Sequence, residues 1–439
     1  DYPQDFQYGL FLAVFDPKGR MRLQKLLGYG RQDLCIGEDG MHTTVGGMPG
    51  MIPTGSWRIV LGIFTEYLKR YAGTMPVEVR MTVTDQEAAV TQPIGPILWT
   101  HGMTAQGIAL DAYDWMTQRK KSAGWYKGDF HTHTRLSDGK HTVKEAMTLA
   151  EQMGLDFYVP TEHNLIHTGW VSTPVMAIPG VEITTELGHC NLFGITEYPS
   201  KIPDILQHMG QPQMETDLLD QIQEAVEHHW IVSVNHPFLH IWKWLCGSLS
   251  LEQIGAMEII NDPTYDYARE ANDKTIRFLD LLHMDGYRIT GIGGSDAHNL
   301  LEERYTDADM PSVAGDPATF VYAEGMSPQS ILQGVRKGNV CVTRYCRMEM
   351  QAEEIPVGSM CPQNGTDGTE TAAAVQPEKQ AEDKKRYLPG DNLRPGSTVQ
   401  IHLQLSEMQQ EPELFAISYR DTEGERRLQR SKVPVKGHT

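Results

Sequence analysis

The stretch that decides the fold is GWYKGDFHTHTRLSDG, residues 124–139. Its first part has the apolar and aromatic content of a buried strand, and the strand ends in His131 and His133. Side chains two positions apart on a strand point to the same face, so two imidazoles placed in this way can bind one metal ion. Taken alone, the pair also fits two solvated or core histidines. Residues 137–139 alone favour a turn.

After this stretch, apolar strands alternate with amphipathic helices. Helices are predicted from Thr142 to a stop at Gly154, over 215–229 and over about 265–285. The strands between them read LDFYVP, VMAIPGVEIT, CNLFGI, WIVSVN, AMEIIN and YRITGIGG. This alternation predicts an α/β fold with a parallel sheet or barrel.

Metal-ligand side chains follow nearly every one of these strands. The carboxyl ends of parallel barrel strands converge on one face, so side chains spread along 170 residues of sequence can share a pocket. Their joint occurrence, rather than any single motif, predicts a multinuclear metal centre. The candidate ligands are His131, His133, Asp138, His163, Glu182, His189, His236, Asp296 and His298.

Imidazole and carboxylate ligands suit Zn, Mn or Fe better than Ca, and we expect two to three divalent ions. His101 and His167 are further histidines that could approach the site. Gly291–Gly294 is rich in glycine but leads into Ser295 and Asp296 rather than a helix, which argues against a dinucleotide site.

The ordered motifs resemble those of the PHP (polymerase and histidinol phosphatase) superfamily over about 124–345. The matching stretches are His131-x-His133 with Ser137-Asp138-Gly139, Thr161-Glu162-His163, Gly180-Val181-Glu182, Gly188-His189, Asn235-His236-Pro237 and Ser295-Asp296-Ala297-His298. Residues 124–129 and 191–194 look most like the carbaryl-hydrolase-type branch (CehA/McbA-like). Residues 52–57 also resemble the β domain that precedes the PHP domain in that branch.

The resemblance implies a PHP-type distorted (β/α)7 barrel with up to three metal ions. It implies that one ion is held by His131, His133, Glu182 and Asp296, a second by Glu182, His189 and His236, and a third by Asp138, His163 and His298. The sequence differs from the family motif at Glu162, where many members of the superfamily have Asp.

The segments on either side read as β structure. We expect an N-terminal β-sandwich over 1–123, from apolar or alternating runs at 9–16, 55–64 and 77–85. The metallohydrolase barrel would occupy 124–345. A small C-terminal β domain would follow over 346–439, with strands at 399–405 and 414–420 and a polar, flexible insertion at about 362–386.

Composition narrows the classes of partner. The 439 residues carry a net charge of −19, which disfavours binding to a nucleic-acid duplex, and no run is long and apolar enough for a membrane span. The six cysteines form no CxxC pair, which favours reduced thiols in the cytoplasm. The chain begins without Met, so the sequence leaves open whether an upstream leader has been removed. The sequence does not indicate the oligomeric state.

We expect a metal-dependent hydrolase in which a metal-bridged hydroxide cleaves a phosphoester bond of a small molecule or nucleotide. Asp296 or His298 is the candidate for moving the proton. One alternative is a carboxylic ester or aryl carbamate hydrolase with the same cluster. An Arg or Lys clamp would favour phosphate, and an apolar wall with Trp would favour an aryl carbamate. The other alternative is a non-enzymatic protein whose β domains bind a partner while the barrel serves as a scaffold.

Overall fold

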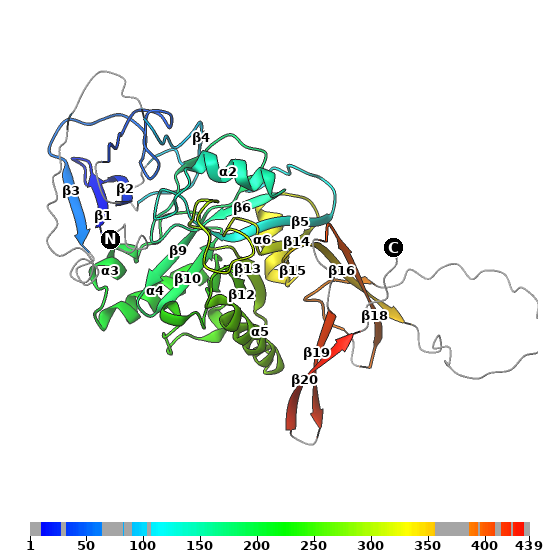
Figure 1. Cartoon of the computed structure of the whole chain (residues 1–439). Coiled ribbons are helices and arrows are strands. Elements are labelled where there is room, and N and C mark those ends of the chain that lie inside the picture. Colours follow the sequence, from blue (N-terminus) through cyan, green and yellow to red (C-terminus); the bar gives the residue numbers. More distant parts are fainter. Residues whose placement is uncertain are drawn as a thin grey trace, which may run out of the picture.

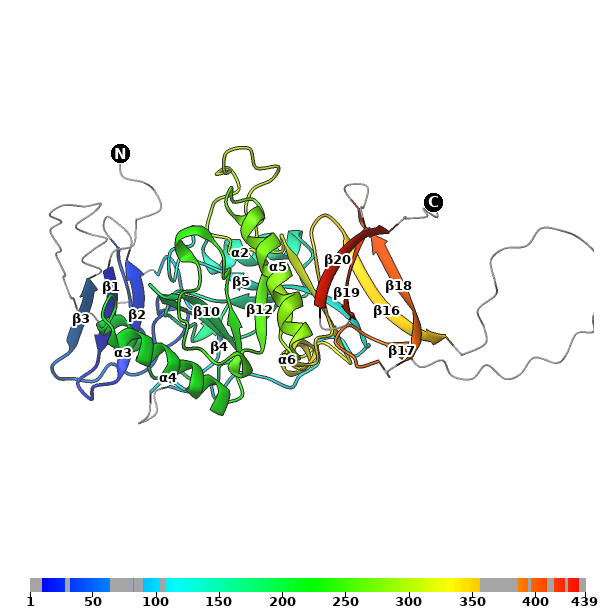
Figure 2. The ribbon, with the colours of Figure 1, turned by 90° about the horizontal axis from the view of Figure 1, so that it is seen from below.

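The computed structural model describes residues 10–27, 32–63, 82, 90–102, 107–355, 386–393, 396–408, 414–422 and 425–433. Within these ranges the fold is mixed α/β with several sheets. The N-terminal strands lie at one end, the helices and two larger sheets lie in the middle, and the C-terminal strands lie at the other end (Figures 1 and 2).

Two five-stranded sheets form the central part. One has the order β13 (Thr290–Gly294), β12 (Ala256–Asn261), β11 (Ile231–Val234), β10 (Gly188–Phe193), β9 (Gly180–Thr185). The other has the order β15 (Val340–Thr343), β14 (Ala318–Ala323), β5 (Gly124–Thr132), β6 (Phe157–Pro160), β8 (Met176–Ala177). Single parallel bridges, Thr132 to Ala297 and His163 to Glu182, join the two sheets beyond their named strands.

The structure has the expected α/β class, but it does not show the expected distorted (β/α)7 barrel as a closed barrel, because the described central strands form two sheets with mixed strand directions. β9 and β10 are connected by only Glu186 and Leu187, which is too short for a helical crossover, so they pair antiparallel. β10 is also antiparallel to β11, and β14 is antiparallel to both of its neighbours. The parallel pairs predicted by the strand–helix alternation are β5 with β6, β6 with β8, β11 with β12 and β12 with β13.

The three predicted helices are present. They are α2 (Val143–Gln152), α4 (Gln213–Glu227) and α5 (Ala268–Met284), and α3 (Ile202–Gln207) and α6 (Pro328–Lys337) complete the α-helices of the described ranges. α2 begins with a capping box, in which Thr142 and Glu145 satisfy each other's main-chain N–H groups. Among the described residues, no helix combines the length and apolar character needed to cross a membrane.

Aromatic packing between the two central sheets fixes the strand ends that carry the site. Phe130 of β5 is fully buried, and its ring centroid lies 5.2 Å from that of Phe157 on β6 and 5.0 Å from that of Phe193 on β10. Because strand side chains alternate, the face opposite Phe130 presents His131. A hydrophobic core on one face thus positions the polar cluster on the other.

The described N-terminal strands form one antiparallel sheet in the order β2 (Met21–Leu27), β1 (Leu10–Phe15), β3 (Arg58–Ile63). β1 and β3 confirm the predicted runs at 9–16 and 55–64. The run at 77–85 lies outside the described residues apart from Thr82. The sequence did not signal β2, because its buried positions include Arg22, Gln24 and Lys25, which break the apolar pattern.

The N-terminal region also touches the central part through a short antiparallel pair, β4 (Ile97–Leu98) with β7 (Gly169–Trp170). At the other end of the chain, β16 (Arg347–Ile355) pairs with β17 (Arg386–Tyr387) and with β18 (Thr398–Ser406). β19 (Leu414–Thr422) and β20 (Glu425–Val433) form a hairpin. β18 and β19 confirm the predicted strands at 399–405 and 414–420, and the insertion at 362–386 lies outside the described residues apart from Arg386.

Candidate metal centre

The structure brings all nine predicted ligands into one cluster, called the nine-residue cluster below. Four overlapping groups have ligand atoms within 4.8 Å of one another. The groups are His133, Asp138, His163 and His298; His131, His236 and Asp296; His131, His133 and Glu182; and His163, Glu182 and His189. The cluster lies where β5, β6, β11 and β13 end, with Glu182 within β9 and His189 near the start of β10.

Glu182 is the centre of the cluster and is fully buried. Its Oε1 lies 3.2 Å from His131 Nε2 and 3.1 Å from His189 Nδ1. Its Oε2 lies 2.6 Å from His163 Nδ1 and 3.7 Å from His133 Nε2. One carboxylate therefore faces four imidazoles, which come from the ends of β5 and β6 and from the start of β10.

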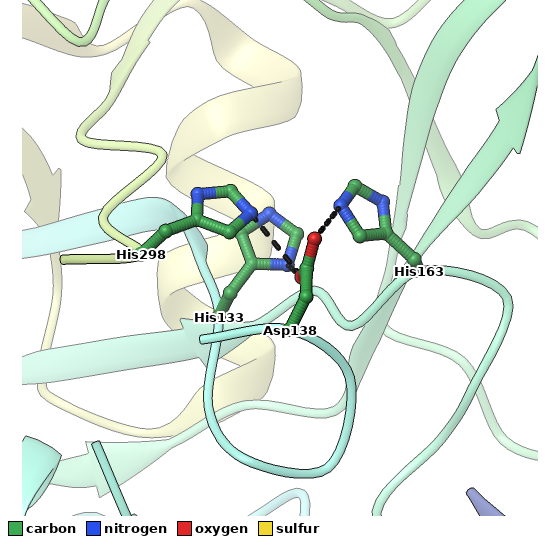
Figure 3. Close-up of side chains that lie close together, drawn as sticks. All are labelled: His133, Asp138, His163 and His298. Atoms are coloured by element: carbon green, nitrogen blue, oxygen red, sulfur yellow. Dashed lines mark ion pairs between the residues drawn. The ribbon is translucent and has the colours of Figure 1, made fainter. Parts of the chain in front are cut away.

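Asp138 organises the more open group, shown in Figure 3. Its Oδ2 lies 3.4 Å from His163 Nε2, and its Oδ1 lies 3.3 Å from His298 Nε2 and 3.9 Å from His133 Nδ1. The rings of His133 and His298 stack with centroids 4.0 Å apart. Three imidazoles and one carboxylate thus point toward a common volume.

Asp296 connects the two parts of the cluster. Its Oδ1 lies 3.1 Å from His133 Nε2, 3.3 Å from His131 Nε2 and 3.5 Å from His298 Nδ1. Asp296 and His236 both have positive φ, 51° and 28° respectively, which is uncommon for residues other than glycine. Such strained positions are typical of functional sites.

The grouping differs in part from the one implied by the family resemblance. His236 lies with His131 and Asp296 as well as 3.8 Å from Glu182. His163 approaches both Asp138 and Glu182. The nine residues are the expected ones, but adjacent groups share His131, His133, His163 and Glu182.

The chemistry of the cluster fits divalent cations. His131 Nε2 lies 3.2 Å from Glu182 and 3.3 Å from Asp296, His133 Nε2 lies 3.1 Å from Asp296, and His236 Nδ1 has no hydrogen-bond partner among the described residues. Imidazole and carboxylate atoms that converge in this way in a poorly exposed site fit a shared cation. Three carboxylates with six neutral imidazoles would also carry a net negative charge, which the low exposure of the cluster opposes unless cations compensate it.

The pKa shifts of the cluster side chains also indicate that the site favours positive charge. Burial disfavours a charged His131, but the carboxylates of Asp296, Glu258 and Glu182 outweigh burial and raise its pKa well above the ordinary value. Burial, His298 and His163 lower the pKa of His133 to about 4. Burial opposes ionisation of Glu182, yet the surrounding imidazoles hold its pKa well below the ordinary value.

Glu258 is a site residue that the sequence reasoning missed. It lies on β12 with 1% exposure, and its Oε1 is 3.0 Å from His131 Nδ1. Its Oε2 accepts hydrogen bonds from the His236 main-chain N–H and from Asn261 Nδ2, both at 3.0 Å. An outer carboxylate of this kind fixes the tautomer and orientation of a ligand histidine. The available signal was a lone charged residue inside the apolar run AMEIIN.

The last glycine of β13 is needed for these contacts. A Cβ on Gly294 would lie 2.1 Å from Glu258 Oε1 and 2.3 Å from His131 Cβ. Gly294 therefore allows the His131–Glu258 pair to approach the β13 main chain. This explains Gly294 without a nucleotide site.

Glu162 positions the loop that carries Asp138. The Thr134 main-chain N–H donates to Glu162 at 3.1 Å, the Ser137 N–H also donates at 3.1 Å, and both hydroxyls donate as well. His167 Nε2 lies 2.9 Å from the same carboxylate. Burial disfavours the charge, but His167 and the other donors lower the pKa of Glu162 to about 2. His167 therefore reaches the site through Glu162, and His101 pairs instead with Asp111 on the surface.

The N-terminal sheet reaches this same loop. The ammonium of Lys25 on β2 donates to the carbonyls of Arg135 and Leu136, and the Leu26 N–H donates to the Leu136 carbonyl at 3.4 Å. Lys25 is buried, and burial lowers its pKa to about 8 against the attraction of Glu162. The loop that carries Asp138 is therefore held by Glu162 from the core and by Lys25 from the N-terminal sheet.

Aromatic side chains gather on the loops that follow β11, β12 and β13. We call them the aromatic rim: His240, Trp242, Tyr265, Tyr267 and Tyr305. Ring centroids are 4.6 Å apart for His240 and Tyr267, 6.1 Å for Trp242 and Tyr265, and 5.1 Å for Tyr265 and Tyr305. Tyr267 is 53% exposed, so the rim is open to solvent beside the cluster.

Comparison with known proteins gave partial structural likenesses. No family model matches the chain, and no curated protein matches it. A two-domain protein from Bacteroides vulgatus, named as containing a predicted PHP-like metal-dependent phosphoesterase, is 18% identical, with a TM-score of 0.36 over 56% of this chain and 83% of that one. An amidohydrolase from Chromobacterium violaceum is 14% identical, with a TM-score of 0.27 over 42% of this chain and 91% of that one. Neither is named as a carbaryl hydrolase, so the resemblance to that branch stays a prediction.

Proposed function

We propose that this protein is a metal-dependent hydrolase that cleaves a phosphoester bond of a small molecule or nucleotide. The observation that carries the proposal is the nine-residue cluster, in which imidazole and carboxylate ligand atoms converge in four overlapping groups, each within 4.8 Å. Bound there, two or three divalent ions would supply Lewis acidity and a hydroxide at neutral pH.

The residues of the chain have separate tasks in this proposal. Asp138, Glu182 and Asp296 would provide the anionic ligands, each between several imidazoles. Glu258 would hold His131 in the orientation that points Nε2 into the cluster. Asp296 and His298, the residues expected to move a proton, both belong to ligand groups. Their lone pairs would be engaged with the ions, so we assign them to binding.

A scaffold without enzymatic activity is disfavoured by the same geometry. Six imidazoles and three carboxylates packed together are costly to maintain unless the cations they attract are bound. A scaffold would not need four overlapping groups of ligand-type atoms, each within 4.8 Å.

The aromatic rim is the one observation that favours the second candidate, an aryl ester or aryl carbamate hydrolase. In the described residues, the ion pairs of the nine-residue cluster involve only histidines and carboxylates, with no Arg or Lys clamp among them. Trp242 and the tyrosines could contact a planar organic group beside the reacting bond. Both candidates use the same hydroxide, so they differ in the bond that is attacked.

The test joins metal analysis with a substrate panel. We expect two to three metal ions per chain, and metal-dependent hydrolysis of p-nitrophenyl phosphate or of a phosphodiester. The double variant His131→Ala with Asp296→Ala should lose both the ions and the activity. Turnover of an aryl N-methylcarbamate alone would establish the second candidate, and a protein that binds no metal after reconstitution would refute both.

A further inference from the structure

Asp262 is a buried carboxyl group beside the cluster that belongs to none of its four ligand groups. It directly follows β12, has a φ of 24° and is 6% exposed. Its main-chain N–H donates to the Gly294 carbonyl at 3.2 Å, two residues before Asp296. The neighbouring Asn261 Nδ2 donates to Asp296 Oδ2 at 3.3 Å. The turn that carries Asp262 is therefore attached to the strand end that carries Asp296.

The partners of Asp262 are hydroxyl groups, unlike those of the other carboxylates around the cluster. Thr264 Oγ1 donates to Asp262 Oδ1 at 2.6 Å, and Tyr305 also hydrogen-bonds to the carboxyl group. Asp138, Glu182 and Asp296 all face imidazoles, as does Glu258. A hydroxyl can donate to a carboxylate or accept from a carboxylic acid, so either protonation state of Asp262 keeps its partners.

Burial is the largest influence on the pKa of Asp262 and raises it. The hydrogen bond from Thr264 lowers the pKa, Asp296 raises it, and Tyr305 and His298 lower it. Asp296, His298 and Tyr305 all lie on the connection after β13. Together these influences raise the pKa of Asp262 to about 7. A carboxyl group that titrates near neutral pH can hold a proton and release it, as a general acid must.

Tyr305 links this carboxyl group to the aromatic rim. Its ring lies 5.1 Å from that of Tyr265 in the rim, which includes the half-exposed Tyr267. An ester whose organic part lay against the rim would therefore be bound beside Tyr305, a hydrogen-bond partner of Asp262. The bridging oxygen of the ester is the atom that needs a proton when the bond breaks.

We propose that Asp262 donates the proton to the leaving-group oxygen, with Thr264 and Tyr305 as its positioning residues; this rests on the proposed hydrolase function. The oxygen of water forms the new bond to phosphorus, and one proton of that water passes to solvent. The bond from phosphorus to the leaving oxygen breaks, its electron pair stays on that oxygen, and the Asp262 proton joins it to give a neutral alcohol. Asp262 then takes a proton from solvent, which restores the balance.

The test is a leaving-group series with the metal-loaded full chain. Asp262→Asn keeps the shape but has no acidic proton. With p-nitrophenyl phosphate, whose leaving group departs without a proton, kcat/KM should change by no more than about threefold. With phenyl and alkyl phosphates it should fall by about 10²–10⁴-fold, the usual worth of general acid catalysis. Tyr305→Phe should show the same trend with a smaller loss, and the loss of wild-type activity at high pH should be absent in Asp262→Asn.

Asp266→Asn is the matched control, because this exposed Asp lies on the same loop. It should leave the whole series unchanged, and all variants should retain the wild-type metal content. Equal loss of activity for every leaving group, or no loss for any of them, would overturn the role of Asp262 while leaving the hydrolase function intact. A metal-loaded wild-type protein that cleaves no ester, phosphate or carbamate would instead refute the proposed function, and the Asp262 role with it.

Discussion

Replacing Lys25 with Met tests whether the N-terminal sheet is part of the metal centre. Met keeps the length of the side chain but removes the ammonium that donates to the carbonyls of Arg135 and Leu136. Asp138 lies two residues beyond Leu136, in the group with His133, His163 and His298. Lys25→Met should therefore free the loop that orients Asp138 while leaving the core untouched.

Lys25→Met should change the free energy of unfolding only slightly, because the cost of burying the ammonium and the gain from its hydrogen bonds oppose each other. Burial lowers the Lys25 pKa from 10.5 to about 8, which corresponds to a cost of about 3 kcal/mol for keeping the charge at neutral pH. Two hydrogen bonds from a charged donor contribute about 1.5–3 kcal/mol each. The net loss on substitution is then about 0–3 kcal/mol. Metal affinity should fall more clearly, by about 10–100-fold, as for other supports of a metal ligand.

The assay measures unfolding by urea and zinc affinity by competition with a chromophoric chelator. Lys127→Met is the matched control, because Lys127 Nζ also donates to a main-chain carbonyl, that of Met153, and burial also lowers its pKa. Lys127 is on β5 at the end away from the site. We expect Lys25→Met to weaken the binding of one zinc ion and Lys127→Met to leave the binding of every zinc ion unchanged. Equal zinc affinities in the two variants and the wild type would refute the coupling of the N-terminal sheet to the site.

Three further predictions address the interior of the site. Glu258→Gln should lower metal affinity by about 10–100-fold, because His131 loses its charged acceptor. The same chelator competition measures this affinity, and an unchanged value would show that Glu258 does not orient His131. Glu162 has its pKa lowered to about 2 from 4.5, so its contribution of about 3 kcal/mol is present above about pH 4.5 and is lost as the pH falls through 2. Urea unfolding should accordingly show a gap between wild type and Glu162→Gln at pH 7 that narrows toward pH 3, and a gap independent of pH would contradict this assignment. Removal of metal with a chelator should lower the unfolding midpoint, and zinc at 100 times its Kd should restore about 2.7 kcal/mol; equal midpoints with and without zinc would mean that the cluster does not bind it.

The sequence was most informative where a local pattern has a local physical cause. The spacing of apolar residues after Thr142 predicted α2, and the alternating run at 399–405 predicted β18. It was less informative where a polar side chain is buried by distant partners. β2 and Glu258 were missed for this reason, because their charged residues break the pattern that marks a strand interior.

The general acid could not have been assigned from the sequence. Asp296 and His298 stood out because they complete a motif, yet the fold places both among the ligand groups. Asp262 belongs to no motif. Its burial and its contacts with Thr264 and Tyr305 depend on where the loops after β12 and β13 meet.

The sequence by itself determined which residue types stand at the strand ends, and so the nine side chains that could bind cations. It could do this because strand ends and their ligand-type residues are adjacent in the chain. Only the tertiary structure decided how those side chains share Glu182, that several neighbouring strands run antiparallel, and that Lys25 and Glu162 hold the Asp138 loop. These features depend on pairings between residues far apart in the chain, such as His131 with Glu258, which are 127 positions apart, and Gly124 with Ala323, which pair between β5 and β14. Such distances are set by packing and not by local preference.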